Sequence, residues 1–257
     1  MSGPNENRPG AGILFMLAAM CLLVSMDAVS RHLTQSYAVS QILFVRFVIF
    51  CLFALILVGP RNVRVRMKSG RPWLQVIRAA VLTLEIATFI LSVRYLPLAD
   101  VHAIGASTPL MVAALAAIFL GESVGWRRWS AIAVGFAAVL VILRPGFRDL
   151  EWFHFLPLFG AFLWAVYQIL VRLVSRTDRP DTTLLYTVFV GLAISATFGL
   201  IDWRMPDPAG WGFLALADPY TLGGGAVVVL VGIYTLERER RLRARDRAAA
   251  PTGTTGD

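Results

Sequence analysis

The chain has 257 residues, of which 57% are hydrophobic and 16% are charged, and its formal net charge is +8. Soluble globular proteins carry about 25% charged residues, so this composition excludes an ordinary soluble enzyme or binding domain. A basic balance can indicate nucleic-acid binding, but the arginines here are spread over many short segments between apolar runs, so we expect no nucleic-acid partner.

The apolar residues form runs of about 20, the length of a helix that crosses a hydrocarbon core about 30 Å thick. They do not alternate with polar residues as the strands of a membrane barrel do. The sequence therefore predicts an all-α integral membrane protein with about eight transmembrane helices. We place the helices at Ala11–Leu33, Ser40–Val58, Trp73–Val93, Val101–Leu120, Trp129–Leu143, Phe155–Val174, Thr183–Ile201 and Leu222–Leu236.

Arginine and lysine are distributed unequally between the two sets of connecting segments. Seventeen lie in the N-terminal tail, the second, fourth and sixth connections and the C-terminal tail, and five lie in the opposite set. Since the loops rich in Arg and Lys stay on the cytoplasmic side, we predict that both termini are cytoplasmic. The six arginines between Arg238 and Arg247 are either a topological anchor or a site for lipid headgroups, and the residues after them are typical of a disordered tail.

Two parts of the chain resemble each other. Ser40–Val48 aligns with Asp181–Phe189, and the same offset places Arg31 on Arg172. Because Arg31 lies at the outer end of the first helix and Arg172 at the inner end of the sixth, the aligned positions lie on opposite sides of the membrane. The pattern therefore indicates an inverted-topology repeat, which is common in secondary transporters. We expect a five-helix repeat over residues 11–146 and a three-helix repeat over residues 153–238, followed by a tail at 239–257.

The second repeat is shorter than the first. The last apolar run resembles Ala133–Val141 but begins near position 222, whereas the offset of the repeat would place it near position 270. The difference of about 50 residues corresponds to two helices with their loops. We therefore expect the counterparts of the third and fourth helices to be absent, with the junction near Ala217–Pro219.

Several stretches in the first repeat are similar to a known family. The chain resembles the drug/metabolite transporter superfamily, in particular its EamA-type repeat proteins. The resemblance implies an inner-membrane transporter of small metabolites or drugs that works by alternating access, with a small molecule and membrane lipid as partners and no cofactor. The matching stretches are Phe44–Phe47, Tyr95–Asp100, Ser107–Leu110, Phe119–Trp129 and Arg144–Gly146.

The incomplete second repeat leaves an alternative open. The family has two five-helix repeats, and the missing helices help to line its central cavity. The chain is therefore either a transporter or a membrane protein that no longer transports and acts structurally or not at all. No nucleophile–base motif and no metal-ligand spacing is present in the sequence, so an enzyme is not expected.

Ionisable residues inside the predicted helices are candidates for function, because a charge in the bilayer is unfavourable unless it is used or paired. Asp27 and Arg46 lie at equal depth on consecutive helices, about 9 Å from the same edge, which permits a contact. Alternatively, Asp27 pairs with Arg31, four residues further along its own helix. Arg46 is either a gate or anion contact or half of a structural ion pair. Glu85 lies near the middle of the bilayer, where it either carries a cation or proton or stays protonated within the bundle. Arg78 is expected to reach the lipid headgroups, and His102 to lie at the membrane surface.

Pro109 interrupts the fourth helix, with Gly105 one turn before it. Proline removes a backbone hydrogen bond and kinks a helix, so Ser107, Thr108 and Pro109 are expected either to form a hinge lining a cavity or to be a kink that only serves packing. With no counterpart of this helix in the chain, we expect a lateral opening beside it, which a second copy in a homodimer would fill.

Overall fold

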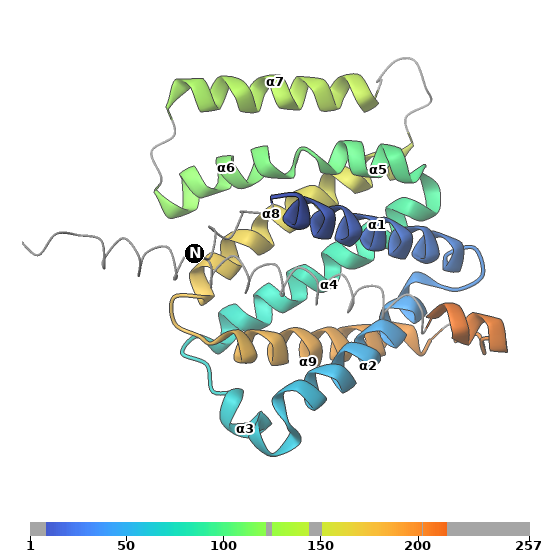
Figure 1. Ribbon diagram of the computed structural model, residues 1–257. Coiled ribbons are helices and arrows are strands. Elements are labelled where there is room, and N and C mark those ends of the chain that lie inside the picture. Colours follow the sequence, from blue (N-terminus) through green and yellow to red (C-terminus); the bar gives the residue numbers. More distant parts are fainter. Residues whose placement is uncertain (1–8, 122–124, 144–150, 202, 215–257) are drawn as a thin grey trace, which may run out of the picture. The chain divides into compact units, whose positions relative to one another are not determined.

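The computed structural model describes residues 9–121, 125–143, 151–201 and 203–214, and in these ranges the chain is helical and has no strand (Figure 1). It divides into two compact units after Met26, and the following paragraphs concern residues 27–214. The elements are α1 Pro9–Leu33, α2 Val39–Val58, η1 Pro60–Asn62, α3 Val63–Arg66, α4 Pro72–Tyr95, α5 Leu98–Gly105, α6 Thr108–Leu120, α7 Trp126–Leu143, η2 Trp152–Phe155, α8 Leu156–Val174 and α9 Pro180–Gly199.

The prediction of an all-α membrane protein is confirmed. Six stretches of the described chain are long and apolar enough to cross a membrane, the fourth being α5 and α6 together, and α7 contains a shorter apolar segment, Trp129–Ala138. Each of the first seven predicted helices therefore has a counterpart in the structure. The eighth, Leu222–Leu236, lies outside the described residues, as do the junction near Ala217–Pro219 and the tail.

Successive spans run in opposite directions, which defines two faces. The connections at 34–38 and after α9 lie at one end of the spans, called here the first face, and those at 59–71 and 175–179 lie at the other, the second face. Helix α2 lies beside α9, and α4 lies beside both α8 and α9 (Figure 1).

Close packing between α2 and α9 depends on small residues. Gly191, Ser195 and Gly199 are all buried and recur every four residues, so they share one face of α9. Phe47 of α2 is fully buried against Gly191. Small residues of this kind let transmembrane helices approach each other closely.

Helix bounds and connections recur in the two halves of the chain. Helix α2 runs from 39 to 58 and α9 from 180 to 199, while α1 ends at 33 and α8 at 174. In the first connection the backbone N–H of Tyr37 donates to the carbonyl of Leu33 at 2.9 Å, and in the second the N–H of Asp178 donates to that of Val174 at 2.9 Å. Helices α2 and α9 thus have the same length and follow the same turn.

The predicted interruption of the fourth span is confirmed, since α5 ends at Gly105 and α6 begins at Thr108. Pro109 has no N–H to donate to the carbonyl of Gly105, and the hydroxyl of Thr108 donates to that carbonyl instead, at 2.7 Å. The hydroxyl of Ser107 donates to the carbonyl of Ile104, also at 2.7 Å. The carbonyl of Gly105, which Pro109 leaves without a backbone donor, is therefore satisfied by a side chain of the same span.

Candidate functional site

Polar side chains from four helices meet inside the spans, near the first face. We call Asp27 and Ser30 of α1, Arg46 of α2, Glu85 of α4 and His102 of α5 the polar cluster. In it, Asp27 Oδ2 lies 3.1 Å from His102 Nε2. The Asp27 side chain is 10% exposed and that of His102 is 47% exposed, so the imidazole faces open space and the carboxylate does not.

Arg46 of α2 joins the polar cluster by a hydrogen bond to α1. Its side chain is buried, and Nη2 donates to Ser30 Oγ at 3.0 Å. Ser30 lies three residues after Asp27, almost one helical turn away. A direct contact between Asp27 and Arg46 stays a prediction, whereas the structure shows a contact between Asp27 and His102.

Glu85 approaches the polar cluster from α4. Phe89, one turn further along α4, packs its ring against His102 with the ring centroids 5.8 Å apart. Helix α4 thus contributes both a second carboxyl and an apolar wall.

The chemistry available to the polar cluster is proton exchange and the binding of polar groups. Its carboxyl and imidazole groups can take up and release protons, and its guanidinium and hydroxyl groups can donate hydrogen bonds. Among the described residues no group of three or more His, Cys, Asp or Glu side chains could hold a metal ion.

The other candidates from the sequence lie apart from these residues. The hydrogen bonds described for Ser107 and Thr108 stay within the break between α5 and α6. Ser107 is 2% exposed, whereas Pro109 is exposed, and a polar opening beside this span stays a prediction. Beside α6 there is instead an apolar groove of about 500 Å³ against α7 and α8, with four phenylalanines, Phe136, Phe155, Phe159 and Phe162, in its wall.

The expectation that Arg78 reaches the headgroups is wrong. Its side chain is fully buried. Nη2 donates to the carbonyl of Thr183 at 2.8 Å and to the hydroxyl of Thr187 at 2.7 Å, and Nε donates to Gln75 Oε1 at 3.1 Å. The guanidinium also lies over the ring of Tyr167, 5.6 Å from its centroid. Neutral acceptors on α9 are nearer than the headgroups, so Arg78 joins α4 to α8 and α9.

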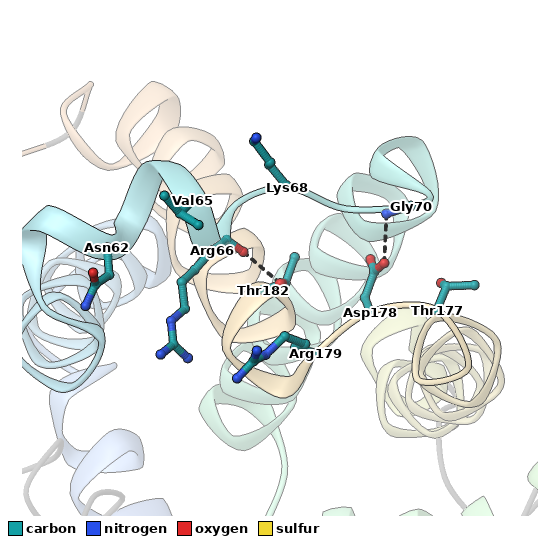
Figure 2. A pocket seen from close by; sticks show the side chains of 9 residues that line it. All are labelled: Asn62, Val65, Arg66, Lys68, Gly70, Thr177, Asp178, Arg179 and Thr182. Carbon is teal, nitrogen blue, oxygen red and sulfur yellow. Dashed lines mark hydrogen bonds between the residues drawn. The ribbon is translucent and has the colours of Figure 1, made fainter.

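At the second face, Asp178 joins the α8–α9 connection to the α2–α4 connection. It accepts hydrogen bonds from the hydroxyl of Ser69, from the backbone N–H of Gly70 at 2.9 Å and from Gln75 Nε2 at 2.8 Å. A cleft of about 490 Å³ opens beside these residues, and Figure 2 shows the side chains that line it, Lys68 among them. Burial raises the pKa of Asp178, but the hydrogen bonds from Ser69, Gln75, Gly70 and Thr177 together lower it below its ordinary value of 3.8.

This pKa shift gives a pH dependence. We expect the Asp178→Asn variant to melt roughly 2–4 °C below the wild type at pH 7, as for a loss of about 1 kcal/mol. A carboxylate with a lowered folded-state pKa stabilises the protein above its unfolded pKa and ceases to do so as the pH falls through the lower folded value. Melting curves of both proteins between pH 7 and pH 3 should therefore converge below pH 3.8. A gap that stays constant down to pH 3 would contradict this account.

The chain is similar to known membrane transporters over most of its length. A model of the EamA-like transporter family matches residues 10–144, more than half of the chain and all of the polar cluster. The riboflavin transporter of Vibrio cholerae is 24% identical over 205 residues, which cover 79% of this chain and 69% of that protein. The riboflavin transporter of Rhizobium johnstonii is 27% identical over 202 residues, 76% and 67% of the two chains. The S-adenosylmethionine uptake transporter of Rickettsia bellii is 24% identical over 224 residues, 85% and 73% of the two.

Proposed function

Because the chain belongs to the EamA-like transporter family and is a membrane transporter of small metabolites, we propose that it is a secondary transporter and not an enzyme, and that the polar cluster is its substrate or coupling-ion site. The observation that carries this proposal is the pair of contacts inside the spans between His102 and Asp27 and between Arg46 and Ser30. Glu85 lies one turn from Phe89, whose ring packs against His102. Ionisable groups at such depth are retained where they serve a transport path.

Alternating access is part of the proposal, with inverted repeats at residues 11–146 and 153–238. The equal lengths of α2 and α9 and the matching turns before them support this division. In inverted-repeat carriers the two halves exchange conformations, so that the site opens to one face and then to the other. Ser107, Thr108 and Pro109 would then act as a hinge in the α5–α6 span.

The orientation follows from the charge bias. We propose an inner-membrane protein with cytoplasmic termini and a cytoplasmic second face, which carries Arg61, Arg64, Arg66, Lys68 and Arg71. In cells of a cysteine-free variant, Lys68→Cys should resist a membrane-impermeant maleimide added outside, and Gln35→Cys at the first face should react with it. Both side chains are exposed, so labelling of Lys68→Cys but not of Gln35→Cys would show that the orientation is the opposite of the one proposed.

Riboflavin and S-adenosylmethionine are the substrates to test first, since the relatives are named for them. The purified protein in proteoliposomes loaded with either compound should exchange it for labelled compound outside. A closely spaced aromatic and ionisable pair, Phe89 and His102, suits a ligand with both ring and polar groups. Counterflow with neither compound, across a panel of related metabolites, would favour the alternative of a protein that no longer transports.

The alternative, a membrane protein that no longer transports, rests on the length of this chain compared with its relatives. The aligned region is 79% of this chain but 69% of the Vibrio cholerae relative, so that relative is the longer of the two proteins.

We propose that a second copy of the chain supplies the missing surface beside α6. Cross-linking of an exposed Ile118→Cys variant in native membranes should then give a dimer, and active transport by a strictly monomeric protein would contradict it.

A further inference from the structure

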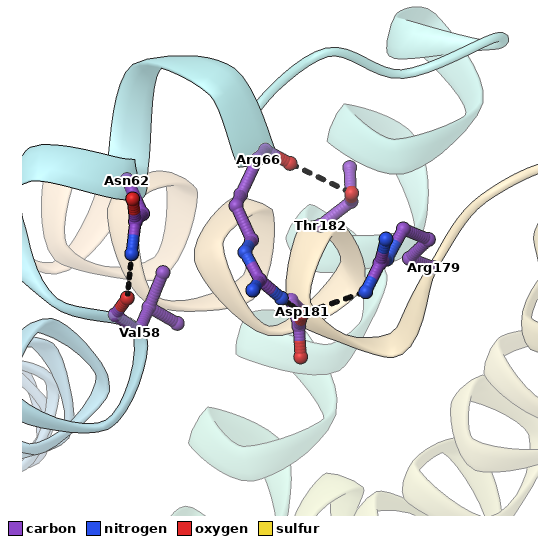
Figure 3. A network of polar contacts seen from close by, with 6 residues as sticks. All are labelled: Val58, Asn62, Arg66, Arg179, Asp181 and Thr182. Atoms are coloured by element: carbon purple, nitrogen blue, oxygen red, sulfur yellow. Dashed lines mark hydrogen bonds and ion pairs between the residues drawn. The ribbon is translucent and has the colours of Figure 1, made fainter.

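Each face of the protein carries a polar clasp between the two halves of the chain. The second-face clasp joins the α2–α4 connection to the start of α9. Besides the bonds to Asp178, it contains an ion pair between Arg66 and Asp181 and a hydrogen bond from the hydroxyl of Thr182 to the carbonyl of Arg66, 2.7 Å long (Figure 3). Arg179 Nη2 lies 3.8 Å from Oδ2 of the same Asp181 carboxylate.

The first-face clasp joins the α1–α2 connection to the segment after α9. The hydroxyl of Tyr37 donates to Asp207 Oδ1 at 3.2 Å. Gln41 Nε2 donates to the carbonyl of Arg204 at 2.6 Å, and Gln41 Oε1 accepts from the backbone N–H of Arg204 at 3.2 Å. As at the second face, residues far apart in the chain are linked through a connection between two spans.

The two clasps are related by the internal repeat. The offset that aligns α2 with α9 places Tyr37 on Asp178 and Gln41 on Thr182, and it places the segment 59–71 on 200–212. Gln41 and Thr182 are both almost fully buried at the first turn of their helices. The same pair of chain segments thus meets at opposite faces, although the side chains that make the contacts differ.

The two clasps differ in strength. At the second face the carboxylate of Asp178 accepts from three groups, and the ion pair between Arg66 and Asp181 adds to them. At the first face the carboxylate of Asp207 accepts one long bond from the other half, from Tyr37. Hydrogen bonds to charged groups are stronger than those between neutral groups, so the second-face clasp is the more stable of the two.

We propose that the two clasps are the gates of this transporter, that each is broken in turn, and that Asp178 and Tyr37 are the positioning residues that set which face opens. This inference rests on the proposed alternating access. Asp178, Tyr37 and Asp207 are all at least partly exposed, so water replaces their bonds when a gate opens. The greater strength of the second-face clasp keeps that face closed at rest and leaves the first face as the one that opens more readily.

The test measures distances across both faces by double electron–electron resonance, with no substrate needed. Cys21 is replaced by serine and Cys51 by alanine, and spin labels are placed at exposed positions. One pair, Lys68→Cys with Arg176→Cys, spans the second face. The other, Gln35→Cys with Ala209→Cys, spans the first face and occupies the positions that align with the first pair in the internal repeat.

Two variants should move the populations in opposite directions. Asp178→Asn should raise the open-to-closed ratio at the second face about tenfold and lower it at the first, because lost bonds to a charged group shift a two-state equilibrium by that order. Tyr37→Phe should do the reverse with a smaller shift. Lengthening of both pairs by both variants, or no change in either, would overturn the inference. Since counterflow is a separate measurement, a failure of the gates and a failure of the transport proposal can be told apart.

Discussion

Substitution of Asp27 by asparagine is expected to lower substrate counterflow by about 10- to 100-fold in proteoliposomes. The change removes the charge that faces His102 at 3.1 Å, and a hydrogen bond to a charged group contributes about 1.5–3 kcal/mol, where about 1.4 kcal/mol corresponds to a factor of ten. The variant leaves the size of the side chain unchanged, so the loss is one of charge and not of packing.

A matched control is available on α5. Asp100 lies two residues before His102 and is partly exposed, so Asp100→Asn removes the same charge without touching the polar cluster and should transport at close to the wild-type rate. His102→Gln should reduce transport as Asp27→Asn does, and the double variant should be no worse than either single one. Transport at the wild-type rate by a folded Asp27→Asn protein would show that the polar cluster takes no part in transport.

The second large effect concerns folding. Gly191→Ala should destabilise the protein by about 1–3 kcal/mol, the range for overpacking in a well-filled interior. A Cβ atom at position 191 would overlap the ring of Phe47, which is fully buried. Thermal unfolding in detergent should show a lower melting temperature and a reduced folded yield.

Two further variants separate overlap from a general effect of alanine. At Gly105 an added Cβ has no atom within 4 Å, so Gly105→Ala should leave the melting temperature almost unchanged. Replacing Phe47 with leucine frees space opposite position 191, so the double variant should recover part of the stability lost in Gly191→Ala. Additive losses in the double variant would mean that the two residues do not meet.

Much of the fold could be predicted because each span must satisfy its own backbone in lipid. That requirement turns runs of about 20 apolar residues into helices, and the lack of an N–H at Pro109 marks the break. The same reasoning selects Asp27, Arg46 and Glu85, since charges within spans are unfavourable. All of this depends on the residue itself and on its depth, both of which are read from a single helix.

What could not be predicted depends on which helices are neighbours. His102 lies just over one turn into α5, a position typical of the membrane surface, and only its proximity to α1 brings it to Asp27. Arg78 was expected at the headgroups because a long side chain can extend there, yet the carbonyl of Thr183 on α9 is within reach. A clue to the α2–α9 contact was present in the spacing of Gly191, Ser195 and Gly199 on one helix face.

The break between α5 and α6 has a consequence for how the chain enters the bilayer during synthesis. A span that needed a neighbouring helix to satisfy its open carbonyls would have to wait for that helix before leaving the translocation channel. The hydroxyls of Ser107 and Thr108 already occupy the carbonyls of Ile104 and Gly105. We therefore expect the interrupted span to partition into lipid before α8 and α9 have been made, and to keep its bend while the rest of the protein assembles around it.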